Sequence, residues 1–262
     1  MVSNLINLEN VENAFGSFNQ SAYSHCVIDN FLQESVAAKI AEDFPAYESG
    51  MYNGTYNNQI ELKRTCNIWD RFPQSIYQLL YCLNSKQFTD LLIGLTGTAN
   101  LYTDPGLHGG GLHCYPQGGK LNPHLDYSIH PKLHLQRKYN LIIYLTPQWQ
   151  PAWGGDFGIW NSDSSGPTTI FQTVSPMFNR AVIFDTTQST WHGLTSAVES
   201  PVGVTRNSIA MYYLTDPPID VDPRSRALFA PTDQQKDDVE IQQLIARRSV
   251  ANGTNVEQWN RT

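Results

Sequence analysis

The chain has 262 residues and a formal net charge of −7, and hydrophobic residues make up 40% of it. This length and composition allow one large domain with a sizeable core. The negative charge and the lack of any basic cluster longer than Arg247-Arg248 argue against a nucleic-acid partner. The longest apolar runs, such as 141–145, are too short to cross a bilayer, so no membrane partner is expected.

The cysteine pattern and the N-terminal segment together predict a cytoplasmic protein. The four Cys residues are widely spaced and form no CxxC pair, which indicates free thiols in a reducing compartment. The segment after Met1 has neither a basic start nor a long apolar run, so we expect no secretory signal.

The first 99 residues are expected to supply one strand and a set of supporting helices. Residues 1–24 are polar and Asn-rich and are predicted to be weakly ordered, whereas residues 25–31 are predicted to form a short strand. Residues 46–60 contain Tyr, Asn and Gly without a period, which predicts a loop. The helices predicted from apolar spacing and from Pro at their boundaries are 33–44, 74–83 and 86–95.

Residues 100–215 have the character of a β-barrel. Short β-type runs alternate there with Gly, Pro and polar turn residues, including an expected polar loop over 161–167. The predicted strands are 139–146, 152–160, 180–185, 188–194 and 206–215. Many short strands with such turns are typical of a jelly roll or a double-stranded β-helix, a cupin-like barrel. The expected fold is therefore mainly β with flanking helices (α+β).

Residues 216–262 form an extension beyond this barrel. It contains a predicted helix over 237–248 and a last dozen residues that are expected to be frayed. We interpret 1–262 as a single domain, made of the N-terminal strand and helices (1–99), the barrel (100–215) and this extension. The C-terminal helix is a candidate contact for a homodimer.

A possible metal site begins with His124 and Asp126. Residues i and i+2 of an extended segment point to the same face, so these two side chains are directed at one spot. His192, on a later predicted strand, is the third candidate ligand. Two His and one carboxylate form the facial triad of non-haem Fe(II) sites, which leaves coordination positions open. The alternative is that His124 and Asp126 are only a hydrogen-bonded pair at the surface.

Four further residues are candidates for holding a second, dicarboxylate ligand. Arg206 offers a planar fork that matches a carboxylate, and Ser208 lies on the same face of the same predicted strand. Tyr144 is a phenol inside the predicted barrel, which usually needs a polar partner. Tyr115 is a weaker candidate for the same pocket. The alternative for Arg206 is an arginine at a strand start that reaches solvent.

The ordered set of motifs resembles the prolyl 4-hydroxylase-like branch of the Fe(II)/2-oxoglutarate-dependent dioxygenases. The matching pieces, which span about residues 25–215, are Val27-Ile28-Asp29-Asn30-Phe31-Leu32, Cys114-Tyr115-Pro116, His124-Leu125-Asp126, Tyr144-Leu145-Thr146, Trp153-Gly154-Gly155-Asp156-Phe157, Asn179-Arg180-Ala181-Val182-Ile183-Phe184, Trp191-His192-Gly193 and Arg206-Asn207-Ser208. The resemblance implies Fe(II), 2-oxoglutarate and O2 as cofactors and co-substrates, with ascorbate as a further candidate.

The same resemblance implies roles for the candidate residues. His124, Asp126 and His192 would be the catalytic metal ligands, and Arg206 with Tyr144 would hold the distal carboxylate of 2-oxoglutarate in a pocket that Tyr115 lines. It implies hydroxylation of an aliphatic C–H bond, with decarboxylation of 2-oxoglutarate to succinate. The presence of Asp126 favours hydroxylation over halogenation, because halogenating relatives vacate this position.

The substrate stays open between a small molecule and a prolyl or other amino-acid residue. The segment 127–138 and the gap from His192 to Arg206 are longer than is typical of peptide-hydroxylating members. Within that segment, His130 and His134 are expected to lie in a solvated insertion. The alternative function is a metal-binding, cupin-like protein, either a non-oxygenase enzyme or a small-ligand sensor, that does not use 2-oxoglutarate.

Overall fold

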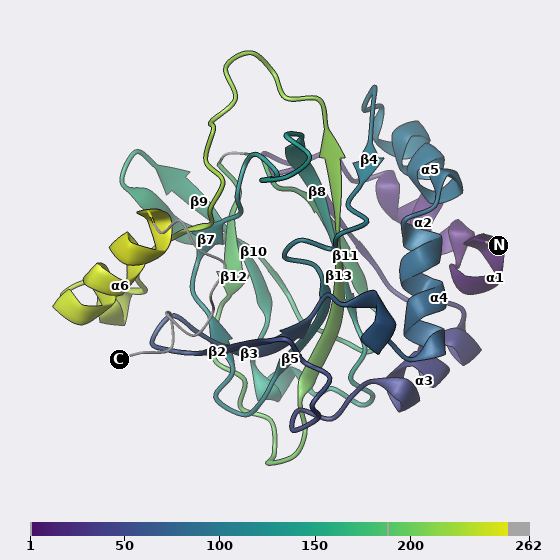
Figure 1. The fold of residues 1–262 in the computed structure, drawn as a ribbon, viewed down its shortest axis with the longest axis horizontal. Helices are drawn as coiled ribbons and strands as arrows, with labels where there is room; N and C mark the ends of the chain where they lie inside the picture. The colour runs from purple at the N-terminus through teal and green to yellow at the C-terminus, as the bar shows by residue number, and fades with distance from the viewer. Residues whose placement is uncertain (1, 188, 251–262) are drawn as a thin grey trace.

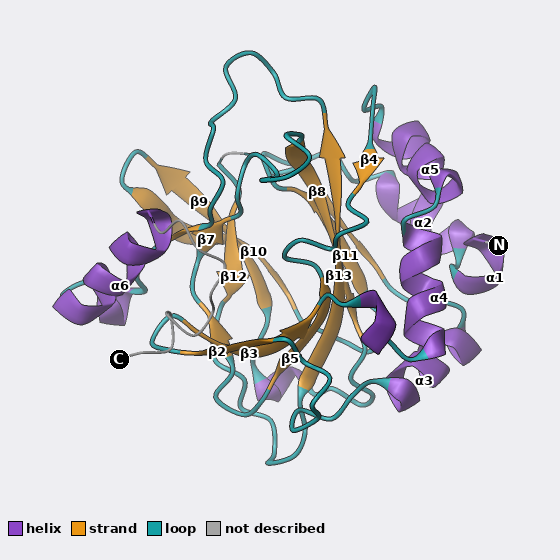
Figure 2. Cartoon of the chain, viewed as in Figure 1, coloured by secondary structure: helices purple, strands orange, loops and turns teal. Residues whose placement is uncertain are grey.

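Two antiparallel sheets face each other at the centre of the molecule, and helices cover the outside of the larger sheet (Figure 1). This computed structural model describes residues 2–187 and 189–250. Figure 2 shows the strands gathered in the middle, with α1 to α5 on one side and α6 on the other. The predicted mainly β fold with flanking helices is confirmed.

The larger sheet has nine strands, and its longest strands lie in the middle. Its order is β1-β11-β8-β13-β5-β3-β2, with β4 paired to β13 and β6 paired to β3. The strands are β1 (His25–Ile28), β2 (Gly54–Asn57), β3 (Glu61–Cys66), β4 (Tyr102–Thr103), β5 (Gly111–Tyr115), β6 (Lys120–Leu121), β8 (Gln136–Tyr144), β11 (Ala181–Asp185) and β13 (Arg206–Thr215).

The smaller sheet has five strands in the order β10-β9-β12-β7-β14. These are β7 (His124–Leu125), β9 (Phe157–Asp163), β10 (Gly166–Val174), β12 (Trp191–Leu194) and β14 (Leu228–Phe229). Two facing antiparallel sheets of this kind make the double-stranded β-helix that the turn spacing predicts.

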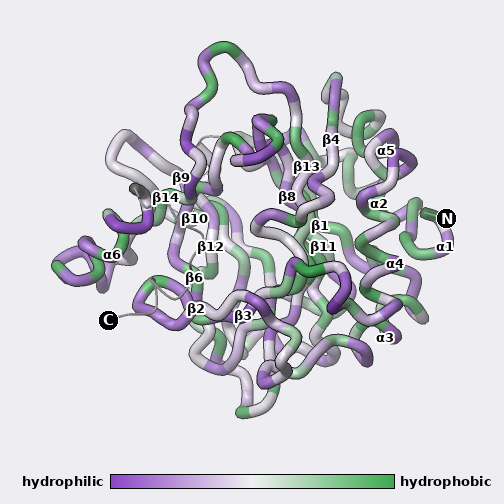
Figure 3. The backbone as a smooth tube through the Cα atoms, viewed as in Figure 1, coloured by the Kyte–Doolittle hydropathy of each residue, from purple (hydrophilic) through white to green (hydrophobic). Residues whose placement is uncertain are grey.

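Helices α1 to α5 pack their apolar faces on the outer face of the larger sheet, whereas α6 packs on β14 of the smaller sheet. They are α1 (Val2–Leu5), α2 (Leu8–Phe15), α3 (Glu34–Asp43), α4 (Gln74–Leu83), α5 (Lys86–Thr96) and α6 (Val239–Val250), with short 3-10 turns at Trp69–Arg71, Pro151–Trp153 and Asp233–Gln235. Ile76 and Leu80 of α4 belong to the same buried cluster as Ile143 of β8 and Ile209 of β13. Figure 3 shows hydrophobic and hydrophilic residues alternating along these helices, as burial on one side requires.

Four predictions about local structure are wrong. The strand predicted over 152–160 begins only at Phe157, because Pro151–Trp153 is a 3-10 turn and Gly154 and Gly155 have a positive φ. Residues 1–24 are not weakly ordered, because Val11 and Phe15 of α2 are buried in the main cluster and fix that helix. Residues 46–60 are not wholly a loop, since β2 begins at Gly54 and pairs with β3. Residues 161–167 are the end of β9, a tight turn and the start of β10. β2 and β10 are edge strands, and the end of β9 is half exposed. Their sequences therefore lack the apolar alternation that marks a strand in sequence.

The remaining chain-wide expectations have clear outcomes. All four Cys are buried and unpaired, as predicted. Within residues 2–187 and 189–250, no helix is long and apolar enough to span a membrane. Residues 251–262, which are expected to be frayed, lie outside the described residues.

Candidate metal and co-substrate site

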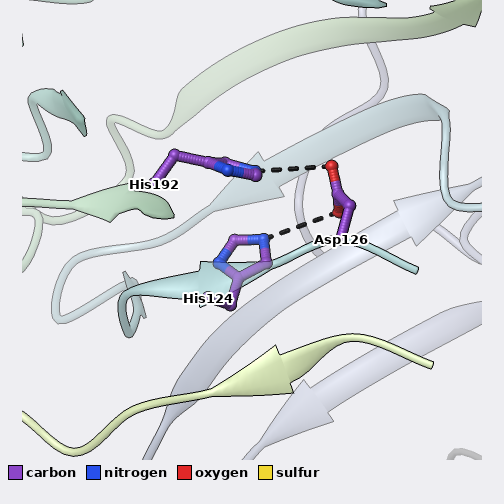
Figure 4. Close-up of side chains that lie close together, drawn as sticks. All are labelled: His124, Asp126 and His192. Atoms are coloured by element: carbon purple, nitrogen blue, oxygen red, sulfur yellow. Dashed lines mark ion pairs between the residues drawn. The ribbon is translucent and has the colours of Figure 1, made fainter. Parts of the chain in front are cut away.

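His124, Asp126 and His192 come together between the two sheets. His124 on β7 lies directly opposite His192 on β12, and Asp126 follows β7 by one residue. One ligand atom from each of the three lies within 4.8 Å of the others. Figure 4 shows both imidazole rings directed at the Asp126 carboxylate. The close approach needs Gly193, because a Cβ there would meet the Leu121 and Asn122 carbonyl oxygens at 2.8 Å.

Hydrogen bonds fix which nitrogen of each imidazole faces the centre. His124 Nδ1 lies 3.0 Å from the Asn122 carbonyl oxygen, and His192 Nδ1 lies 2.9 Å from the Thr190 carbonyl oxygen. A carbonyl can only accept, so Nδ1 carries the proton in both rings and donates it. In the neutral form of each ring, Nε2 is then the nitrogen with the lone pair, and it is turned toward Asp126 at 3.7 Å for His124 and 3.4 Å for His192.

Burial and the neighbouring Arg137 set the charge of this cluster. Burial, with His192 nearby, lowers the pKa of His124 to about 3, so the ring is neutral. Burial alone would raise the pKa of Asp126, but the Arg137 guanidinium outweighs that effect and lowers it below its usual range, so the carboxylate is ionised. Its Oδ2 is buried and has no hydrogen-bond partner in the described part of the chain. Two imidazoles and one carboxylate are a fitting donor set for Fe(II).

Aromatic rings on both sides hold the two imidazoles in place. Phe229 of β14 stacks on His124, with ring centroids 5.2 Å apart, and Phe184 of β11 meets His192 edge-on at 4.8 Å. Ring orientation is therefore set by packing as well as by the Nδ1 bonds.

The candidate co-substrate residues all lie on the larger sheet, opposite the triad. Arg206 pairs with Tyr115 across β13 and β5, and Ser208 pairs with Tyr144 across β13 and β8. Tyr115, Arg206 and Ser208 line one cavity of about 180 Å³ together with the triad. Tyr144 does not line this cavity but lies behind the guanidinium, whose carbon is 4.9 Å from its ring centroid.

Arg206 and Tyr144 offer hydrogen-bond donors that the folded chain does not use. Arg206 Nε donates to the Gly155 carbonyl oxygen at 2.7 Å, and the rest of its fork has no hydrogen bond among the described residues. The Tyr144 hydroxyl is buried without a partner in the described ranges, and burial raises its pKa to about 12. Unpaired buried donors are costly, and a carboxylate that enters between them would satisfy both. The residues present therefore fit 2-oxoglutarate.

Arg137 is a residue of this site that the sequence does not reveal. Its Nη1 lies 2.9 Å from Asp126 Oδ1, and its Nη2 donates to the His108 carbonyl oxygen at 2.9 Å. The guanidinium lies between the rings of Tyr127 and Tyr212, at 3.5 and 3.3 Å from their centroids. In sequence it stands in Gln136-Arg137-Lys138, which looks like a solvated polar run, so no signal separates it from a surface arginine.

The segment 127–138 is not the solvated insertion that the sequence predicts. His130 is buried, lies 3.4 Å from Asp104 Oδ2, and accepts hydrogen bonds from the Lys132 and Leu133 backbone amides at its Nδ1. Residues 131–134 are exposed at the tip of the segment. The segment therefore folds back onto the barrel and presents Tyr127 to Arg137.

The C-terminal extension also takes part in the site. Leu228 and Phe229 of β14 pair with Leu125 and His124 of β7. Figure 1 shows the chain leaving β13 on the larger sheet and crossing to the side of the molecule where β7 and α6 lie. Arg224, within this crossing, donates to the Asp126 backbone carbonyl oxygen at 3.0 Å.

Replacing Arg137 with Gln is expected to weaken divalent-metal binding by about 10- to 100-fold, the usual effect of losing a partner that orients a metal ligand. Arg137→Lys keeps the charge but loses the two-point contact, so its metal affinity is expected to lie between those of the wild type and Arg137→Gln. Calorimetric titration with Mn(II) measures the change. Lys138→Gln is the matched control, since Lys138 pairs with Asp185 at 2.6 Å and is not among the cavity residues. Wild-type metal affinity in Arg137→Gln would contradict this positioning role.

Comparisons with known proteins agree with the geometry. Residues 110–214, which contain all seven predicted site residues, match the family model of the 2OG-Fe(II) oxygenase superfamily. No curated protein matches the chain in sequence.

Three solved structures share its fold. A Trichoplax adhaerens prolyl hydroxylase in complex with a hypoxia inducible factor peptide fragment has a TM-score of 0.55 at 21% identity, covering 79% of this chain and 90% of that one. A Pseudomonas putida prolyl-4-hydroxylase has a TM-score of 0.55 at 17% identity, covering 78% and 98%. A structure of prolyl 4-hydroxylases from Phytophthora capsici has a TM-score of 0.51 at 15% identity, covering 92% and 79%.

The family match decides against a cupin-like protein that makes no use of 2-oxoglutarate. Fe(II) and 2-oxoglutarate are the cofactor and co-substrate of the matched superfamily. The chain is a 2-oxoglutarate-dependent dioxygenase whose residues 110–214 match the 2OG-Fe(II) oxygenase superfamily model and whose fold is that of the prolyl hydroxylases.

Proposed function

We propose that this protein hydroxylates an aliphatic C–H bond, with His124, Asp126 and His192 as its catalytic iron ligands. Arg206, Tyr144, Ser208 and Tyr115 form the 2-oxoglutarate site in this proposal. The observation that supports it best is the convergence of two imidazole lone pairs on a buried, ionised carboxylate, opposite an arginine whose fork is largely unused.

The chain's own residues bind and orient the reactants. Bound Fe(II), with 2-oxoglutarate and O2, supplies the oxidant for an unactivated C–H bond. Three protein ligands leave positions open for the reactants, and Arg206 fixes the far end of 2-oxoglutarate by its charge. Ile142, Phe157 and Leu194 line the cavity with apolar surface that excludes water. Because Asp126 occupies the third ligand position, we propose hydroxylation rather than halogenation.

A small molecule is the proposed substrate class. Ala227, Phe229 and Arg248 of the C-terminal extension line the cavity, so the extension narrows the space above the triad. His124, Asp126 and His192 are each less than 8% exposed, which suits a compact substrate. A prolyl residue of a peptide is the second candidate, since one structural neighbour holds a peptide fragment.

A turnover screen tests this function. The purified protein is given Fe(II), 2-oxoglutarate and O2 with amino acids, other metabolites or proline-containing peptides, and succinate and hydroxylated product are measured. We expect succinate formation that requires both iron and 2-oxoglutarate, and stimulation by a small molecule rather than by peptides. Iron-independent succinate formation would contradict the oxygenase site, and stimulation by peptides alone would contradict the small-molecule class.

A further inference from the structure

The cavity that holds the triad adjoins a second, outer chamber of about 370 Å³. The outer chamber lies between the β2–β3 hairpin, residues 108–110 and the segment 225–227, with Arg248 of α6 also on its wall. Lys63, His108 and His113 are among the residues that line both spaces. A ligand in the outer chamber can therefore extend toward the metal ligands.

The charge of the outer chamber is opposite to that of the whole protein. The chain carries a net charge of −7, yet Lys63, Arg226 and Arg248 line this chamber, and no carboxylate among the described residues does. Glu61, on the wall of the inner cavity, lies 3.4 Å from Lys63 and also pairs with Arg248. Glu61 therefore offsets only part of the charge of Lys63 and Arg248, Arg226 adds a third cation, and the described residues of the chamber keep an excess of positive charge.

Lys63 remains charged although it is almost fully enclosed. Its side chain is 11% exposed, and its Nζ lies 5.2 Å from the ring centroid of Tyr56 and 6.0 Å from that of Tyr115. Burial lowers its pKa, but Tyr115, Glu61 and Tyr56 together outweigh that effect and raise it. Enclosing a cation with too little opposite charge is unfavourable, and an incoming anion would relieve it.

Arg226 is the cation of this chamber that has no partner. It makes no hydrogen bond or ion pair with any described residue, although the neighbouring Arg224 pairs with Asp222 at 2.5 Å. His113 and His108 add neutral rings, since burial lowers their pKa to about 3 and about 4. Neutral imidazoles contribute hydrogen bonds without further charge, so a small oxyanion would meet one free guanidinium, one buried ammonium and two imidazoles.

We propose that the outer chamber binds an oxyanion group of the substrate, a carboxylate or a phosphate, through Arg226 and Lys63. This inference rests on the proposed function, and it restricts the substrate to a small acid whose C–H bond lies in the inner cavity. It is a second anion site, separate from the one that Arg206 provides for 2-oxoglutarate.

Calorimetry on the full chain, loaded with Mn(II) and 2-oxoglutarate without O2, tests the inference. Inorganic phosphate and acetate are the two probes, and they separate phosphate from carboxylate recognition. We expect one equivalent of at least one probe to bind. Arg226→Gln should weaken that binding at least about tenfold, as expected for losing a hydrogen bond from a charged group. Arg226→Glu should weaken it further, and Lys63→Met should weaken it to a similar extent as Arg226→Gln.

Arg247→Gln is the matched control. Arg247 is exposed on α6, next to Arg248, and lines neither chamber. Arg226 lies on a half-exposed loop, so its variants test the inference even where Lys63→Met does not fold. The oxyanion site is overturned if wild type binds neither phosphate nor acetate. It is also overturned if Arg226→Glu binds the probe as tightly as wild type, or if Arg247→Gln weakens that binding as much as the Arg226 variants do. Failure of wild type to bind 2-oxoglutarate is a separate result and overturns the proposed function.

Discussion

His192→Gln and Asp126→Asn are each expected to abolish 2-oxoglutarate turnover and to weaken divalent-metal binding by more than about 100-fold, beyond the loss that partners of metal ligands produce. His192→Gln removes one inward lone pair, and the Gln amide cannot reproduce an imidazole that is fixed by the Thr190 carbonyl and by Phe184. Asp126→Asn removes the only carboxylate of the triad and leaves Arg137 beside a neutral amide.

Competition with a chelator measures the metal affinity, and succinate formation measures the turnover. His25→Gln is the matched control. His25 lies on β1, its Nδ1 hydrogen-bonds to the Tyr23 carbonyl oxygen, and it is not part of the triad. Melting temperatures without metal show whether each variant folds. A His192→Gln protein that folds, keeps wild-type metal affinity and still forms succinate would refute the assignment of the triad.

Local patterns predict the residues of the site better than they predict its surroundings. His124 and Asp126 share a face because strand period is a property of two or three residues. Arg206 and Ser208 share one for the same reason, and the run 206–215 is apolar and Tyr-rich enough for β13 to be predicted with the bounds it has. These predictions need no knowledge of what the strands pair with.

Contacts between distant segments are what the sequence does not reveal. Arg137 becomes part of the site only when β8 places it beside Asp126 and Tyr212 closes over it. Phe229 stacks on His124 because the chain returns from the far sheet to pair β14 with β7. Lys63 looks like an exposed residue of a polar stretch, and only the pairing of β3 with β2 and β5 encloses it. Such register is set by the whole fold.

Arg206→Gln is expected to weaken 2-oxoglutarate binding by about 2–5 kcal/mol, which is roughly 30-fold to several thousand-fold in Kd. The substitution removes the charge that pairs with the distal carboxylate. It also leaves the Gly155 carbonyl oxygen without the Nε donor it has at 2.7 Å. Arg206→Lys keeps the charge and should recover part of the affinity, but a point charge cannot replace the two-point fork. Anaerobic calorimetry with Mn(II)-loaded protein gives the Kd.

Tyr144→Phe separates the phenol from the guanidinium. Loss of one hydrogen bond to a charged carboxylate should weaken 2-oxoglutarate binding by roughly 1.5–3 kcal/mol, a smaller effect than the largest loss expected for Arg206→Gln. Without ligand the same change should not lower the free energy of unfolding, because the hydroxyl it removes is buried and has no partner among the described residues.

Arg180→Gln is the control, since Arg180 pairs with Asp29 and lies outside the cavity. If Arg206→Gln bound 2-oxoglutarate as tightly as Arg180→Gln, the arginine would not be the anchor. If Tyr144→Phe destabilised the ligand-free protein, the phenol would have a partner in the folded chain and would not be reserved for the ligand.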